Sequence, residues 1–157
     1  RATNPSCVIC LGDSFDDPLA EKKSLDSAEI GLLKHLQKDR DWIWISGNHD
    51  PYSSHRNREY LNSFSTSSIT FRHIALRKEH GEISGHYHPK ISINLSKATV
   101  SRACFIADRK RVIMPAYGTY TGGMSVLSKE IKALVEPDAV VMLTGSKIRV
   151  FPYLSCF

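Results

Sequence analysis

Long apolar segments are missing from this sequence of 157 residues. No run approaches the roughly 18 apolar residues that a transmembrane helix requires. The chain also opens with Arg1-Ala2-Thr3-Asn4-Pro5, without the apolar stretch behind a basic start that marks a signal peptide. These absences predict a cytoplasmic protein with no membrane partner. The first residue is not Met, so a targeting segment upstream of residue 1 stays open.

A concentrated basic tract and a disulfide framework are missing as well. The 21 Lys and Arg residues outnumber 16 Asp and Glu residues and give a net charge of +5, whose sign suits a polyanionic partner such as nucleic acid. The basic residues are spread along the chain, however, and fit an ordinary solvated surface equally well. Cys7 and Cys10 have C-x-x-C spacing but lie in an apolar run typical of a strand, where residues three apart point to opposite faces. We therefore expect all four cysteines to be reduced.

What is present has the composition of an ordinary soluble globular protein. Hydrophobic residues make up 41% and charged residues 24% of the chain, and the length fits a single domain over residues 1–157. Apolar runs at 7–11 and 42–45 predict strands, and apolar residues at helical spacing over 25–38 predict a helix between them. This order predicts a βαβ unit with a right-handed crossover.

The second half changes pattern. Short apolar runs separated by turn residues predict many closely spaced strands and a mainly antiparallel arrangement. These runs lie at 69–74, 82–84, 91–95, 103–107, 111–114, 139–143 and 148–153. We expect one short helix over 128–135 and a loop over the low-complexity stretch 63–68.

Polar residues that can bind metals follow these predicted strands. Gly12-Asp13-Ser14 and Gly47-Asn48-His49-Asp50 come after the first two strands, and Gly85-His86-Tyr87-His88-Pro89 comes later in the chain. Sites in open α/β sheets form beyond the carboxyl ends of strands, so the first two loops should open at one rim. Each motif alone is weak, because Gly-Asp turns are common and two nearby histidines are often incidental. Their conjunction behind strands is far more specific.

In this order the motifs resemble the calcineurin-like metallophosphoesterases. The resemblance implies a two-sheet α/β sandwich flanked by helices. Further stretches resemble the bacterial ligase-associated DNA-damage-response phosphoesterases, a branch described as endonucleases encoded beside a DNA ligase and a helicase. Those stretches are Cys10-Leu11-Gly12-Asp13-Ser14-Phe15, Gly47-Asn48-His49-Asp50-Pro51, residues 81–89 and residues 115–123.

The superfamily resemblance implies two divalent metal ions. Asp13 would bridge them, Asn48 and His86 would bind the second ion with one further histidine, and His88 would bind the first. Carboxylate, amide and imidazole ligands together suit manganese, iron or zinc better than calcium, and of these we expect manganese. For the further histidine we favour His73 over His80, on the branch resemblance.

The resemblance also implies catalytic roles for His49 and Asp50. His49 would act as a general acid or stabilise charge in the transition state. Asp50 would hydrogen-bond the His49 ring and set its tautomer.

One family motif is missing. Members begin with Asp-x-His on an N-terminal strand, but residues 1–11 contain neither Asp nor His. We expect the first strand to lie upstream of Arg1, and we expect this chain alone to hold one metal tightly and the other poorly. Two alternatives are a degenerate member that serves as an interaction module and, less favoured, substitute ligands at Asp16 and Asp17.

The substrate is less well defined by the sequence. The stretch 115–123 is rich in Gly, Thr and Tyr, so Tyr117 and Tyr120 could stack on bases at the rim of the site, or the stretch could be a plain bend between strands. The branch resemblance implies a phosphodiesterase or endonuclease acting on DNA in repair, with a ligase and helicase system as partners. Small phosphodiesters, nucleotides and phosphoproteins are the competing substrates.

Overall fold

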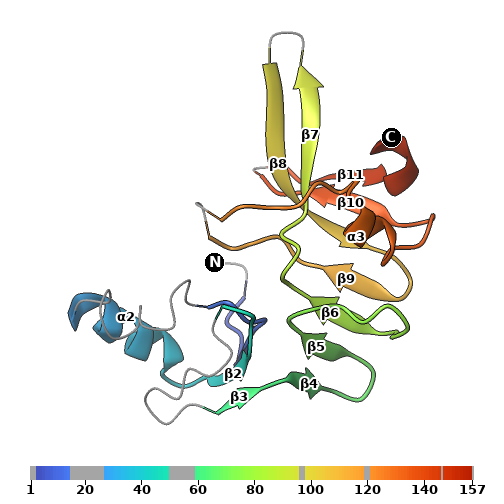
Figure 1. Ribbon diagram of the computed structural model, residues 1–157. Helices are drawn as coiled ribbons and strands as arrows, with labels where there is room; N and C mark the ends of the chain where they lie inside the picture. Colours follow the sequence, from blue (N-terminus) through green and yellow to red (C-terminus); the bar gives the residue numbers. More distant parts are fainter. Residues whose placement is uncertain are drawn as a thin grey trace.

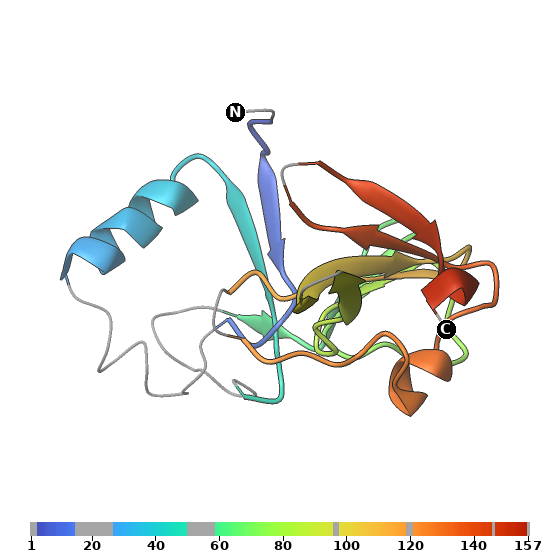
Figure 2. The same cartoon turned by 90° about the horizontal axis from the view of Figure 1, so that it is seen from above.

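The structure, a computed structural model, describes residues 3–14, 27–49, 59–95, 98–118, 121–145 and 147–156. Across these residues the chain forms two β-sheets and a few short helices (Figure 1). In Figure 2, the helix α2, the small sheet and the large sheet follow one another as layers. The expected α/β class with two sheets is confirmed.

The small sheet is parallel throughout. It contains β1 (Cys7–Cys10), β2 (Asp41–Ile45) and β3 (Tyr60–Leu61), in the order β1-β2-β3. The helix α2 (Ser27–Gln37) lies between β1 and β2 in the chain, as a parallel pair requires. The predicted βαβ unit is therefore present, and the carboxyl ends of β1 and β2 lie at the same edge.

The helix α2 is less buried than its apolar spacing suggests. None of its residues is buried, and Leu32 and Leu36 are 59% and 46% exposed. Ile30, Leu33 and Gln37 are half-buried, so the helix rests on the protein along a neighbouring stripe. Spacing of apolar residues predicted the helix itself, but not which side it would turn inward.

The large sheet has eight strands. Its order is β11-β10-β8-β9-β6-β5-β4, with β7 paired to β8 as a projecting hairpin (Figure 1). The strands are β4 (Ser63–Ser65), β5 (Thr70–Arg72), β6 (Glu82–Ser84), β7 (Lys90–Leu95), β8 (Ala98–Ala107), β9 (Arg111–Ile113), β10 (Val140–Leu143) and β11 (Arg149–Pro152).

The expected antiparallel pairing holds for most of this sheet but not for its centre. The strands β5, β6 and β9 pair in parallel, while the other pairings are antiparallel. Parallel neighbours bring their carboxyl ends to one edge, so His73 after β5 and Gly85-His86 after β6 emerge together. This parallel centre is what positions the histidine loops.

The prediction of a loop over residues 63–68 is wrong for its first half. Ser63–Ser65 forms β4, which pairs antiparallel with β5. Phe64 lies opposite Phe71, with ring centroids 6.3 Å apart, and the Ser65 and Thr70 hydroxyls lie 3.0 Å apart. Cross-strand pairs of this kind stabilise a strand that composition alone had suggested was irregular.

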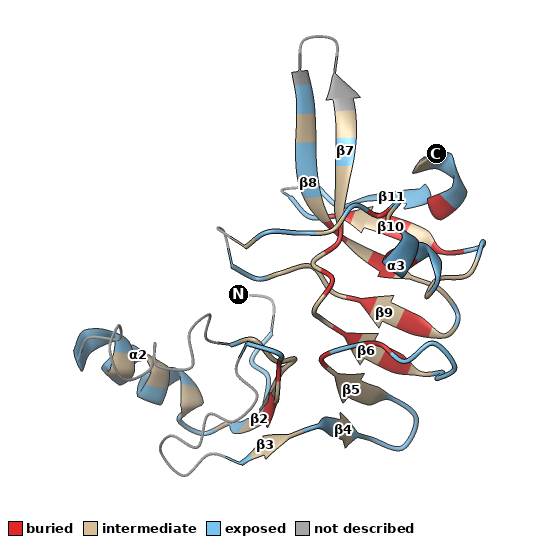
Figure 3. Cartoon of the chain, viewed as in Figure 1, coloured by how far each residue is buried: buried red, intermediate tan, exposed pale blue. Residues whose placement is uncertain are grey.

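The hydrophobic core lies in the large sheet and beneath its C-terminal connections. Figure 3 shows buried residues on β6, β8, β9 and β10. The short helix α3 (Lys129–Lys132) buries Ile131 and is capped by Ser128, whose hydroxyl accepts a hydrogen bond from Ile131 N. Tyr153 begins the 3-10 helix η1 (Tyr153–Cys156), and its hydroxyl donates to the Val126 carbonyl at 2.7 Å. The predicted helix over 128–135 is thus present but shorter.

A buried ion pair anchors the connection that follows β5. Arg111 donates to the Glu82 carboxylate at 2.8 Å and to the carbonyls of Leu76, Arg77 and Glu79. Both charged side chains are almost fully buried. The pair therefore ties residues 76–79 to β6 and β9 and restrains the connection that carries His73.

Two further expectations concern the chain as a whole. All four cysteines are free, as predicted. Over the described residues, the helices are too short or too polar to span a bilayer.

Candidate metal centre

Asp13 is placed by a sharp turn at the end of β1. Gly12 has φ of +90°, a conformation that residues with a Cβ rarely adopt. A Cβ there would also lie 2.6 Å from His73 Nδ1. The glycine therefore permits both the turn and the close approach of His73 to the strand end.

His73 lies at the centre of the cluster. Its Nδ1 atom is 2.7 Å from the Leu11 carbonyl oxygen, which can only accept a hydrogen bond. Nδ1 therefore carries the proton, and in the neutral ring Nε2 presents its lone pair. That Nε2 atom lies 3.1 Å from Asp13 Oδ2 and 2.9 Å from Asn48 Oδ1.

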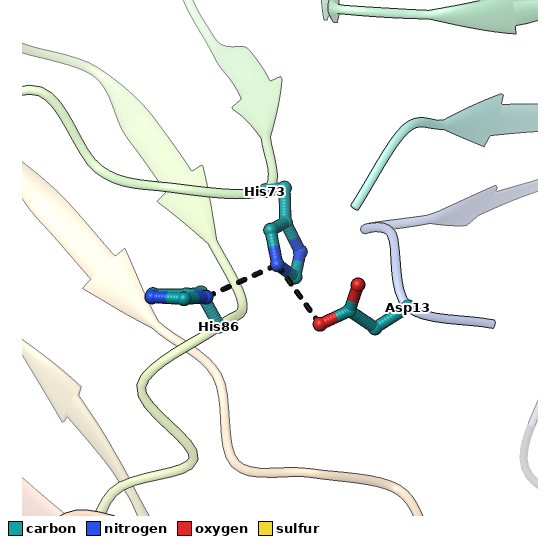
Figure 4. Close-up of side chains that lie close together, drawn as sticks. All are labelled: Asp13, His73 and His86. Carbon is teal, nitrogen blue, oxygen red and sulfur yellow. Dashed lines mark hydrogen bonds and ion pairs between the residues drawn. The ribbon is translucent and has the colours of Figure 1, made fainter. Parts of the chain in front are cut away.

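His86 reaches the same point from the loop after β6. Its Nδ1 atom lies 3.2 Å from His73 Nε2, and the two rings meet edge to face with centroids 5.0 Å apart. Figure 4 shows the His73 ring between His86 and the Asp13 carboxylate. Burial lowers the pKa of His86, the neighbouring His73 lowers it further, and the Asp13 carboxylate opposes the change. The neutral ring, which is the form that binds metals, is favoured.

The four side chains match the donor set of a divalent cation. Asp13, His73 and His86 have ligand atoms that all lie within 4.8 Å of one another, and Asn48 Oδ1 adds a neutral oxygen. With the proton of His73 on Nδ1, the Nε2 lone pair faces the Asp13 and Asn48 oxygens, and these three atoms repel one another unless a positive charge lies between them. The separations of 2.9 to 3.2 Å around His73 Nε2 also match the roughly 3 Å between adjacent ligands of an octahedral ion bound at about 2.1 Å.

The backbone of this region is unusual. Among the described non-glycine residues, positive φ occurs at Asp13, His86, His88 and Asp39, so three of the four belong to the predicted site. Such conformations are uncommon and persist where the surrounding structure enforces them, often at functional sites. Here they turn the donor atoms of Asp13 and His86 toward His73.

His88 lies beside the cluster but outside its tight group. Its φ is +45°. Burial lowers the pKa of His88, Asp13 opposes this change, and His73 and Lys90 lower the pKa further. His88 is therefore close enough to interact electrostatically with the cluster. The group of atoms within 4.8 Å contains His86 and not His88. This arrangement leaves His88 free for a neighbouring position, as the family resemblance implies.

His49 is exposed next to Asn48 at the end of β2. Its backbone N–H donates to Asp13 Oδ1 at 2.8 Å, so this loop helps to orient the Asp13 carboxylate. Asp50, the predicted partner of the His49 ring, lies outside the described residues, as do Tyr120, Asp16 and Asp17. Tyr117 is fully exposed on the segment after β9.

The sequence patterns missed two features of the site. The Leu11 carbonyl fixes the tautomer of His73. Every residue has a backbone carbonyl, so the sequence could not predict which one would accept this hydrogen bond. Arg72, which precedes His73, lines a pocket of about 250 Å³ beside Asn48. An arginine directly before a candidate ligand was the available signal.

Comparison with known proteins identifies the family. The family model of the calcineurin-like phosphoesterases matches residues 1–141, most of the chain. The protein therefore belongs to the calcineurin-like phosphoesterase family, whose members generally depend on two metal ions. No curated protein matches the chain closely enough to count as a relative.

A solved structure supports the same fold. The fold is similar to that of the Pseudomonas putida nuclease MPE, with a TM-score of 0.64 and 19% sequence identity. The match covers 88% of this chain and 66% of the nuclease, so the chain spans just under two thirds of that protein. At this identity the likeness shows the fold alone.

Proposed function

We propose that this protein is a divalent-metal-dependent phosphoesterase that cleaves phosphodiester bonds, with DNA as its substrate in repair. The proposal rests above all on the meeting of Asp13, Asn48, His73 and His86 around one point, although they come from four separate parts of the chain. Family membership supports the phosphoester chemistry. We assign residues 1–157 to one domain of this type.

The residues divide into two ligand groups. Asn48, His73 and His86 would hold one ion with Asp13, while Asp13 and His88 would face the second position. These residues would hold a divalent cation, which would supply Lewis-acid polarisation of a phosphate ester and offset negative charge on its oxygens. The chain orients its ligands by hydrogen bonds, from His73 Nδ1–H to Leu11 and from His49 N–H to Asp13. Manganese is the ion that we propose for this mixed set, with iron and zinc as alternatives.

His49 is proposed to touch the substrate. Its side chain is exposed at the end of β2, next to Asn48, where it can reach a phosphate ester in the site. There it would give a proton to the departing oxygen or stabilise negative charge on it. Asp50 would hold the His49 ring in the required tautomer.

DNA is proposed on three grounds. The motifs resemble the ligase-associated DNA-damage-response branch, the chain carries a net charge of +5, and the structurally similar protein is a nuclease. A ligase and helicase repair system is the partner that the resemblance implies.

Hydrolysis of bis-p-nitrophenyl phosphate tests the phosphoesterase. The purified protein should hydrolyse it with added Mn²⁺ and not in EDTA. The His49→Ala variant should retain its bound metal and lose at least about 100-fold in kcat, as expected for a proton donor. If the protein binds no metal and shows no turnover, it is an interaction module instead.

Nicking of circular plasmid tests the DNA assignment. Cleavage should depend on Mn²⁺ and weaken as salt rises, because DNA binding releases counterions from phosphates. An enzyme that hydrolyses the small diester but never nicks plasmid or single-stranded DNA would be a phosphoesterase for small nucleotides.

A further inference from the structure

A polar pocket adjoins the candidate metal centre on the side of Asn48. Its volume is about 250 Å³, the space of about eight waters at about 30 Å³ each. Ser46, Gly47, Asn48, Asn62, Arg72, His73 and Ile74 line it. Because Asn48 and His73 also belong to the metal cluster, a group in the pocket would be a direct neighbour of a substrate held at the metals.

The wall of this pocket carries an excess positive charge. Glu82 pairs through one carboxylate oxygen with Arg111 and through the other with Arg72 Nε, at 2.8 and 3.1 Å. One carboxylate therefore pairs with two guanidinium groups. The buried trio of Arg72, Glu82 and Arg111 keeps a net charge of +1. Both terminal nitrogens of Arg111 donate hydrogen bonds, to Glu82 and to the carbonyls of residues 76, 77 and 79.

The remaining charge is therefore available at Arg72. Its side chain is 18% exposed, and its terminal nitrogens make no hydrogen bond to the described residues. Glu82 is fully buried behind it, so the face that Arg72 offers to the pocket is positive. A guanidinium held in this way is suited to two parallel hydrogen bonds with a phosphate.

Neutral donors complete the pocket. Asn48 directs its amide oxygen toward His73 Nε2 at 2.9 Å, which leaves its NH₂ group for another acceptor. Asn62 is exposed at the pocket wall between β3 and β4. A cationic side chain together with neutral amide donors, and no carboxylate among the lining residues, is the chemistry of an oxyanion site.

We propose that this pocket binds a phosphate group of the substrate next to the one that is cleaved, so that Arg72 selects polynucleotides over esters with a single phosphate. This inference rests on the proposed function, because it assigns a second phosphate to the substrate of the same site. Arg72 would bind the substrate and take no part in bond cleavage.

Binding of a fluorescein-labelled five-nucleotide oligothymidylate in EDTA, where cleavage is blocked, tests this directly. The Arg72→Gln variant should raise the Kd about tenfold and reduce the slope of log K against log salt by about 0.7, the value for one lost phosphate contact on a single strand. The Arg102→Gln variant is the matched control, because Arg102 is an exposed arginine on β8, outside the pocket; it should keep the wild-type Kd and slope.

A second variant avoids the buried trio. Asn62→Asp places a negative charge at the pocket wall without touching Glu82, and it too should weaken oligothymidylate binding about tenfold while the Tm stays near that of the wild type. The inference is overturned if the oligonucleotide does not bind the wild type, or if both variants bind it with the wild-type Kd and salt slope. Failure of the proposed function is distinct: the wild type would then not hydrolyse bis-p-nitrophenyl phosphate with Mn²⁺, whatever it binds in EDTA.

Discussion

The Cα atom of Gly47 lies directly against the carboxylate of Asp13, so closely that a Cβ on Gly47 would come within 2.7 Å of Asp13 Cγ. The two residues follow neighbouring parallel strands, β1 and β2, whose ends meet at one edge of the small sheet. The absence of a side chain at position 47 is therefore what lets the Asp13 carboxylate reach His73.

Replacement of this glycine should damage the site. In Gly47→Ala the new methyl group must displace Asp13, so we expect Mn²⁺ affinity to fall by about 10- to 100-fold, as when the partners that orient a metal ligand are lost. Isothermal titration with Mn²⁺ measures the change. Gly31→Ala is the matched control, because a Cβ at Gly31 on α2 meets nothing within 4 Å. That variant should keep wild-type affinity and be more stable by up to about 1 kcal/mol. Equal Mn²⁺ affinity in both variants would show that Gly47 does not pack against Asp13 as the structure indicates.

Mn²⁺ should stabilise the folded protein through the histidine cluster. A ligand that binds only the folded state, present at 100 times its Kd, adds about 2.7 kcal/mol to the free energy of unfolding. We expect Mn²⁺ to raise the Tm of the wild type and EDTA to reverse the rise. His73→Asn should abolish the shift, whereas His35→Asn, an exposed position on α2, should keep it. A full Tm shift in the His73 variant would exclude His73 as a ligand.

The buried pair of Glu82 and Arg111 should matter far more than an exposed one. Glu82→Gln leaves a guanidinium buried without its counter-charge, and we expect a loss of about 3 to 5 kcal/mol in the free energy of unfolding. Lys110 and Glu136 form a pair that is more than a third exposed, so Glu136→Gln should cost less than about 1 kcal/mol. Urea unfolding of both variants compares the two. Similar losses would show that Glu82 is not held as the structure indicates.

The cysteines should differ sharply in reactivity. Burial raises the pKa of the Cys104 thiol from 9.0 to about 12, and the nearby Cys156 adds to the rise. A raised pKa keeps the thiol protonated and unreactive below pH 12, and as pH climbs from 9 toward 12 the folded state loses stability, because the unfolded chain releases this proton first. At pH 8.5, iodoacetamide should label exposed Cys7 and leave Cys104 unmodified until urea unfolds the protein. Mass spectrometry of peptides distinguishes the two sites, and early labelling of Cys104 would refute its burial.

Much of the site could be predicted from the sequence, because its donors follow strand ends. Asp13, Asn48 and His86 each follow a glycine in a short motif after a predicted strand, so the local sequence was enough to identify them as candidate ligands. His73 was harder, since it stands alone after β5, and only its resemblance to a family pattern favoured it over His80. In the structure it is the residue to which the other three converge.

Other features could not be predicted, because they depend on pairing between distant segments. Ser63–Ser65 forms a strand by pairing with β5, where Phe64 lies opposite Phe71. The parallel pairing of β5, β6 and β9 is equally non-local, and it gathers the histidine loops at one edge.

The sequence by itself determined the class of the protein, the βαβ unit and the candidate metal-binding side chains. These depend on local properties: apolar periodicity, glycine at sharp turns, and donor atoms of the right chemistry. Only the tertiary structure decided that Glu82 neutralises Arg111 and leaves the charge of Arg72 beside a pocket. Charge balance in a buried cluster depends on which segments meet in space, and no local pattern in the chain records that.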